Sequence, residues 1–153
     1  MTRRLLGATL LALVASHAHA ALGDTVASIA LDTARLGDAH RVVIASATAS
    51  VRTHVITLRD GSVIKEFVGN DDRVFAVTWN TRFKPRLDGL LGQYAQTYAT
   101  AAGQAARSPG IRHSLAFNDG DLVVDATAHL NAHAGLAYLR SLVPADVRVD
   151  ELR

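Results

Sequence analysis

The sequence predicts a single α+β domain in which an antiparallel β-meander and a second hairpin are covered by one main amphipathic helix. Three observations predict it. Three β-rich runs (51–59, 62–68 and 74–79) are separated by turn-forming residues, a stripe of leucine and tyrosine at helical spacing follows them, and two more alternating runs flank Asn118-Asp119-Gly120.

The first 20 residues read as a cleavable signal peptide. Arg3 and Arg4 give the positive start, residues 5–15 are almost unbroken apolar, and Ala18-His19-Ala20 is a small-x-small cleavage site. The apolar run is shorter than the roughly 20 residues of a membrane-spanning helix, and no cysteine is present to carry a lipid. We therefore expect cleavage after Ala20, an exported protein that is periplasmic or secreted without a membrane anchor, and a single domain over residues 21–153.

Charge limits the classes of partner. Cleavage removes two arginines and no acidic residue, which leaves 14 basic residues against 14 acidic ones. Because nucleic-acid binding depends on a clustered positive charge, a balanced and scattered pattern argues against a nucleic-acid partner. The absence of cysteine is compatible with an oxidising compartment, which permits disulfides without requiring them.

The first element after the signal peptide is predicted as a short helix over residues 24–37. Asp24 can cap its start and Gly37 can end it, while apolar residues recur between them at helical spacing. Residues 38–50 have no clear period and are interpreted as a loop or a frayed strand.

The meander is the clearest element. If Asp60-Gly61 forms a two-residue turn, His54 faces Phe67, Ile56 faces Lys65 and Leu58 faces Val63. Pairing of Val68 with Val74 then brings Phe67 to Phe75 and Val63 to Trp79. One face of the meander is expected to form the core, with Ile56, Leu58, Val63, Phe67, Phe75, Val77 and Trp79.

The main helix is predicted to begin at Pro85, whose fixed φ suits a first turn. Its apolar stripe is Leu87, Leu90, Leu91, Tyr94 and Tyr98, and it fades before Ser108-Pro109-Gly110. Gly89 and Gly92 are interpreted as positions of close approach between helix and sheet.

The last third returns to strands. Residues 111–117 and 121–130 are expected to form the second hairpin. In the second run, apolar residues alternate with polar ones: Leu122, Val124, Ala126, Ala128 and Leu130 with Asp121, Asp125, Thr127 and His129. A turn is expected at 131–134 and a strand or short helix at 136–142, which Pro144 ends.

Several stretches resemble a family of exported proteobacterial proteins known only as domain of unknown function 2844. They are the hairpin 51–68 (VRTHVITLRDGSVIKEFV), 74–79 (VFAVTW), 87–94 (LDGLLGQY), 120–124 (GDLVV), Ala137-Tyr138 and 142–144 (LVP). A glycine-rich, His-containing segment of that family matches more loosely here, at 126–130 (ATAHL). The resemblance implies export and fold, and it implies no activity or catalytic residue.

Histidines are the first candidates for chemistry. His129 and His133 are four residues apart, as in helical zinc sites, and His113 is a possible third ligand if the late strands pair. The local pattern favours a strand running into a turn, so a hydrogen-bonded or exposed pair is the alternative, and no metal or cofactor is expected. His54 with the nearby acid Glu66 is a candidate general base, although the register above sends Glu66 to the other face, and a satisfied buried histidine is the alternative.

A ligand cleft is a further candidate, located at Trp79, Phe83 and Tyr94, where the end of a strand meets the main helix. The alternative is that these aromatic residues belong to the core and its edge.

Two functional hypotheses remain. No catalytic glycine-serine elbow, phosphate loop or dinucleotide fingerprint is present, so the first is a non-catalytic binding or interaction module whose open sheet edge accepts a strand from an envelope protein partner. The second is a small periplasmic enzyme that uses His54 or His129 with a nearby acid such as Glu66.

Overall fold

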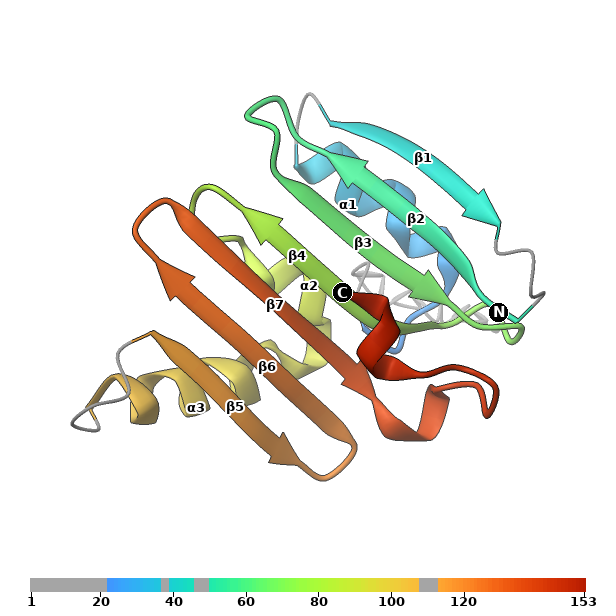
Figure 1. Ribbon diagram of the computed structural model, residues 1–153. Helices are drawn as coiled ribbons and strands as arrows, with labels where there is room; N and C mark the ends of the chain where they lie inside the picture. Colours follow the sequence, from blue (N-terminus) through green and yellow to red (C-terminus); the bar gives the residue numbers. More distant parts are fainter. Residues whose placement is uncertain (1–21, 37–38, 46–49, 108–112) are drawn as a thin grey trace, which may run out of the picture.

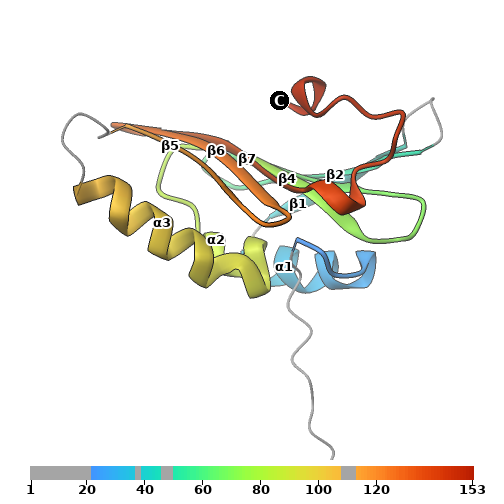
Figure 2. The same cartoon turned by 90° about the horizontal axis from the view of Figure 1, so that it is seen from below.

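The computed structural model describes residues 22–36, 39–45, 50–107 and 113–153, so the predicted signal peptide lies outside the described residues. Seven antiparallel strands form one sheet in the order β1-β2-β3-β4-β7-β6-β5, with helices under one of its faces (Figures 1 and 2). The strands are β1 (His40–Ala45), β2 (Arg52–Thr57), β3 (Val63–Val68), β4 (Val74–Thr81), β5 (Ser114–Asp119), β6 (Leu122–His129) and β7 (Ala132–Leu139). The helices are η1 (Val26–Ser28), α1 (Ile29–Arg35), α2 (Leu87–Leu91), η2 (Gly92–Tyr94), α3 (Ala95–Arg107), η3 (Arg140–Leu142) and η4 (Val149–Leu152). The predicted α+β class is confirmed.

The β2–β3 hairpin has a three-residue loop, not the two-residue turn that we assumed. Leu58 N donates to Ser62 O at 2.8 Å, Gly61 N donates to Leu58 O at 3.0 Å, and Gly61 has a φ of 83°. This is a type I turn followed by a glycine in the left-handed region. The extra loop residue shifts the register by one, so His54 lies opposite Glu66 and Ile56 opposite Ile64. The predicted partners Phe67 and Lys65 are therefore wrong.

The β3–β4 pairing agrees better with the sequence. Val68 lies opposite Val74 as predicted, but a bulge follows, so that Phe67 lies opposite Ala76 and Val63 opposite Asn80. The rings of Phe67 and Phe75 still meet, with their centroids 6.2 Å apart.

The sheet buries apolar side chains on both faces. The face toward the helices, called here the helix face, carries Ile56, Ile64, Val77, Trp79, Val124 and Ala137. The opposite face carries Phe67, Phe75, Ala76 and Leu136, which form a smaller cluster with Leu152 of the C-terminal segment 140–153 that covers them (Figure 2). The residues predicted to share one core face thus lie on both faces of the sheet, because Phe67 and Phe75 belong to the second cluster.

The predicted main helix is present but interrupted. It begins at Leu87, two residues after Pro85, and Gly92, with φ 48° and ψ −121°, separates α2 from α3. The positive φ of Gly92 is a backbone conformation that favours glycine, which gives this glycine a role besides the close approach that we expected. Leu87, Leu90 and Leu91 are buried on the helix face as predicted.

The segment before α1 is held by the turn between β3 and β4. Gly23 N donates to Val74 O at 2.8 Å and Val74 N donates to Asp24 O at 2.9 Å, while the Arg73 guanidinium donates twice to Gly23 O, at 2.8 and 2.9 Å. The side chain of Asp24 does not cap the helix, because Thr25 occupies the N-cap position and makes no side-chain cap hydrogen bond.

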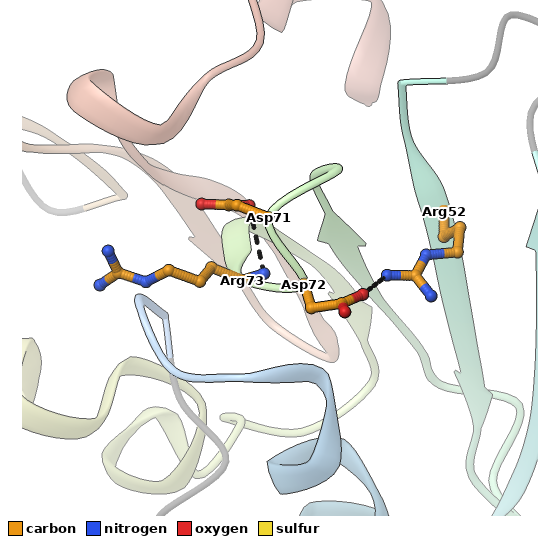
Figure 3. Close-up of polar contacts among 4 residues, drawn as sticks. All are labelled: Arg52, Asp71, Asp72 and Arg73. Carbon is orange, nitrogen blue, oxygen red and sulfur yellow. Dashed lines mark hydrogen bonds and ion pairs between the residues drawn. The ribbon is translucent and has the colours of Figure 1, made fainter.

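Figure 3 shows the turn that holds this segment. The Asp71 carboxylate accepts from Arg73 N at 3.2 Å, and Asp72, with φ 60°, forms an ion pair with Arg52 of β2. Bonds that stabilise the turn thus account for both acidic residues, Asp71 and Asp72.

Two strands extend beyond the sequence-based expectation. Residues 40–45, interpreted as loop or frayed strand, form β1, and β7 begins at Ala132, inside the expected turn. The turn itself is only Leu130-Asn131, with Asn131 at φ 59°. β7 lies between β4 and β6 in the middle of the sheet. It thus joins the strands β1 to β4 to the β5–β6 hairpin (Figure 1).

Candidate functional site

The outer edge of the sheet at β1 exposes three consecutive large apolar side chains. Val42, Val43 and Ile44 are 58%, 50% and 53% exposed. β1 pairs only with β2, and no other described strand lies along its outer edge. Open edge strands normally carry lysine, proline or a bulge that discourages pairing with another chain. The described part of β1 has a single charged residue within the strand, Arg41.

The other edge, at β5, is protected. Its apolar side chains, Leu115 and Phe117, are half-buried toward α3, and the ring of Phe117 lies 6.4 Å from that of Tyr98. Its exposed positions are small or polar, including Ser114, Ala116 and Asn118. The two edges therefore differ in chemistry, and the apolar, unprotected one is β1.

A cleft of about 330 Å³ lies on the helix face between α3 and the strands β4 to β7. The register explains why it is hollow: Trp79, Gly135, Ala126 and Leu115 lie side by side on four neighbouring strands, with the two smallest residues in the middle. The facing surface of α3 is also small, with Ala102, Ala105 and Ala106 in the cleft wall. Small residues on both sides leave the space open.

The predicted cleft residues divide between this cleft and its surroundings. Trp79 lines it and is buried, with its indole over Gly135. Phe83 is 62% exposed beside the cleft, and Tyr94 packs against the main core, so neither is among its lining residues. Tyr98 of α3 lines the cleft in place of Tyr94. Burial raises the pKa of the Tyr98 hydroxyl.

The three histidines that we considered as metal ligands do not come together. His113 and His129 are neighbours, and His133 lies apart from His129. The rings of His113 and His129 stack with centroids 5.3 Å apart, and Nδ1 of His113 lies 3.1 Å from the Ala128 carbonyl oxygen. His133 lies opposite Ala128 and hence on the helix face, whereas His129 alternates to the other face. Over the part of the chain that the structure describes, no group of three His, Asp or Glu side chains is placed to hold a metal ion.

His54 and Glu66 lie directly opposite each other on the helix face, which the predicted register excluded. Both are buried, at 4% and 1% exposure. Neither ring nitrogen of His54 has a hydrogen-bond partner among the described residues. Burial, and then the charges of Arg41 and Arg52, hold the pKa of His54 below its ordinary value. The pair is sealed from solvent, which argues against contact with a substrate, but His54 is also not the hydrogen-bonded buried histidine of the alternative interpretation.

Replacing His54 should change how stability depends on pH. The folded protein resists protonation of a histidine whose pKa is lowered, while the unfolded chain protonates it near its ordinary pKa of 6.5. The contribution of His54 to stability should thus be complete above pH 6.5 and be lost as the pH drops below it. In His54→Leu this part of the loss should disappear, as measured by urea unfolding between pH 7 and pH 5. Equal slopes for the wild type and His54→Leu would contradict the prediction.

A second groove, with several polar and charged side chains in its lining, lies on the opposite face of the sheet, and sequence analysis did not find it. Its volume is about 410 Å³, and it is lined by Lys65, Thr78, Asn80, Asp125 and Thr127 among others. Arg153 forms an ion pair with Asp125 at its side. The only sequence signal was the polar half of the strand alternation, which is equally typical of a solvated sheet face.

These features define an α+β protein with one antiparallel sheet, an apolar open edge and a small cleft, and with no helix among its described residues that is long and apolar enough to cross a membrane. The chain belongs to the family described as "Protein of unknown function (DUF2844)", whose model matches residues 18–152. No curated protein and no solved structure matches the chain.

Proposed function

We propose that this protein is a non-catalytic, exported binding module that takes an extended segment of a protein partner as an additional strand beside β1. The observation that carries the proposal is the run of three exposed apolar residues, Val42, Val43 and Ile44, on an unpaired edge. Strand addition uses the free backbone donors and acceptors of such an edge for affinity, and its side chains for specificity.

β1 exposes apolar side chains on both faces of the sheet, so an added strand could make apolar contacts on both of its faces. Successive residues of a strand point to opposite faces, so Val42 and Ile44 lie on one face of the sheet and Val43 on the other. An incoming strand with apolar residues at consecutive positions would cover exposed surface on both faces. Such cross-strand pairs of β-branched residues each stabilise a sheet by about 0.2–1 kcal/mol.

Export is part of the proposal. It is supported by the order of charge, apolar run and small-x-small site in residues 1–20, and by a family match that starts at residue 18, close to the proposed cleavage after Ala20. The partner would then be another protein of the cell envelope.

The enzyme hypothesis has less support. His54 and Glu66 do lie together, but both are buried, and the described clefts include neither residue. His129 is exposed, and its ring stacks on that of His113.

Site-specific photocrosslinking in the native envelope tests the proposal. The photoreactive residue p-benzoyl-L-phenylalanine replaces Val42 or Ile44 in the full-length chain, with Gln96 on α3 and Leu130 at the β6–β7 turn as exposed control positions. We expect one protein to be crosslinked at both edge positions and at neither control, through a single peptide of strand-forming sequence. Equal crosslinking at all four positions, or adducts only with a second copy of the chain, would reject a dedicated partner at β1.

A further inference from the structure

The cleft between α3 and the sheet combines an apolar interior with a basic rim. Its interior is formed by Trp79, Leu87, Tyr98 and Leu115. Lys84, His113 and His133 also line it, and none of the described lining residues is acidic. A volume of about 330 Å³ falls within the range of small-molecule sites, toward its lower end.

The basic residues gather at one end of the cleft. His113, Ala128, His133 and Thr81 occupy neighbouring strands in one row across the end of the sheet. The Thr81 hydroxyl donates to Phe83 O at 2.8 Å and lies 3.4 Å from His133 O, which ties the turn before Lys84 to the start of β7. The next row inward is Leu115, Ala126, Gly135 and Trp79. A molecule in the cleft would therefore meet cationic or hydrogen-bonding groups at the mouth and apolar groups inside.

We propose that this cleft binds a small amphipathic carboxylate, with its apolar body between α3 and the sheet and its carboxylate at Lys84 and His133. The proposal is independent of strand addition at β1, which lies at the far edge of the sheet (Figure 1).

The positive charge at the rim of the cleft favours a carboxylate over an uncharged or a cationic ligand of the same size. An ammonium beside a carboxylate forms a charge-assisted hydrogen bond, which is roughly twice as strong as a neutral one. His113 lines the cleft, but we do not assign its Nδ1 to the ligand, because this atom is directed to the Ala128 carbonyl oxygen. A cationic ligand would instead meet Lys84 without an acidic residue to neutralise it.

Trp79 provides the readout. It is the single tryptophan of the chain and lines the cleft, so its fluorescence reports on occupancy. The probe is octanoate, and the comparison ligands are octanol, which has the same chain without charge, and octylamine, which is cationic. We expect a saturable change in Trp79 emission with octanoate, about tenfold weaker binding of octanol, and no saturable change with octylamine. Equal affinity for octanoate and octanol, or no saturable response to octanoate, would overturn the proposal.

Two pairs of variants locate the site. Ala105→Leu fills the cleft and should abolish the octanoate response, whereas Ala99→Leu, at an exposed position of the same helix, should keep it. Lys84→Gln should weaken octanoate binding about tenfold and leave octanol binding unchanged, while Lys65→Gln, on the opposite face of the sheet, should change neither. Thermal unfolding checks that the members of each pair are equally folded. An octanoate response that survives Ala105→Leu, or that Lys65→Gln weakens as much as Lys84→Gln does, would also overturn the proposal.

Discussion

Gly135→Ala should destabilise the protein by about 3 kcal/mol, because a methyl group at this position would collide with the body of the Trp79 side chain. An ideal Cβ at Gly135 would lie 2.5 Å from Cε2 and 2.8 Å from Cη2 of the indole. These are ring atoms of a residue that is only 4% exposed, so the indole has little room to move away. Both residues lie in central strands, which pair on both sides, and the backbone cannot easily yield either.

Urea unfolding followed by circular dichroism measures this change, and the emission of Trp79 reports whether the indole has moved. Gly103→Ala is the matched control, because nothing lies within 4 Å of a Cβ at Gly103 and the residue lies inside α3. That variant should be more stable than the wild type by about 0.5–1 kcal/mol, the ordinary gain of alanine over glycine in a helix. Wild-type stability and unchanged Trp79 emission in Gly135→Ala would show that the indole does not lie over Gly135.

Replacing Val42 and Ile44 together by glutamate should weaken binding of the partner found by crosslinking about a hundredfold. Each replacement removes apolar contact with the added strand and places a charge at the interface, and two losses of somewhat more than 1 kcal/mol each correspond to this factor. Since both side chains are more than half exposed in the free protein, the free energy of unfolding should change little. Titration of the purified double variant with the partner segment measures the affinity.

The control for this variant is Phe83→Glu with Leu130→Glu. These residues are the other large apolar side chains recorded as exposed, at 62% and 93%, and they lie away from β1. Their replacement should leave partner binding unchanged. An equal loss of affinity in both double variants would mean that general surface hydrophobicity, and not the β1 edge, recruits the partner.

The meander shows how far the sequence could predict the fold. The strands and the Val68–Val74 pairing were predictable from alternation and from the turns. The register of the first hairpin was not, because Asp60-Gly61 fits a two-residue turn and a three-residue loop equally well. Alternation could not decide between them, since β3 has apolar residues in adjacent positions, Val63-Ile64 and Phe67-Val68, and is buried on both faces.

β7 was only partly predictable for a different reason. Its sequence, AHAGLAYL, has no β-branched residue, and a strand of alanine, histidine and glycine has low β propensity. Its place between β4 and β6 determines its structure, and the small residues are needed beneath Trp79 and α3. The same small residues create the cleft, so the site near Trp79 could be predicted approximately, but not its walls.

The two candidate sites with histidines illustrate a related limit. The one-residue register error placed Glu66 on the wrong face and concealed its pairing with His54. The i, i+4 spacing of His129 and His133 suggested a common helical face, but a two-residue turn between strands places them on opposite faces of a sheet. An open edge could be predicted, but its location at β1 could not, because residues 40–45 have no clear period and only the sheet order shows that they form an edge strand.

The most direct test of strand addition is hydrogen exchange at the backbone amides of β1, measured with and without the partner segment. In an antiparallel sheet about half of the amides of an edge strand point away from their neighbour and exchange from the folded state. We predict that the outward amides of β1 become protected when the partner binds, while protection in β5, at the other edge, stays unchanged. Binding that leaves the exchange of β1 as it is in the free protein would contradict the account.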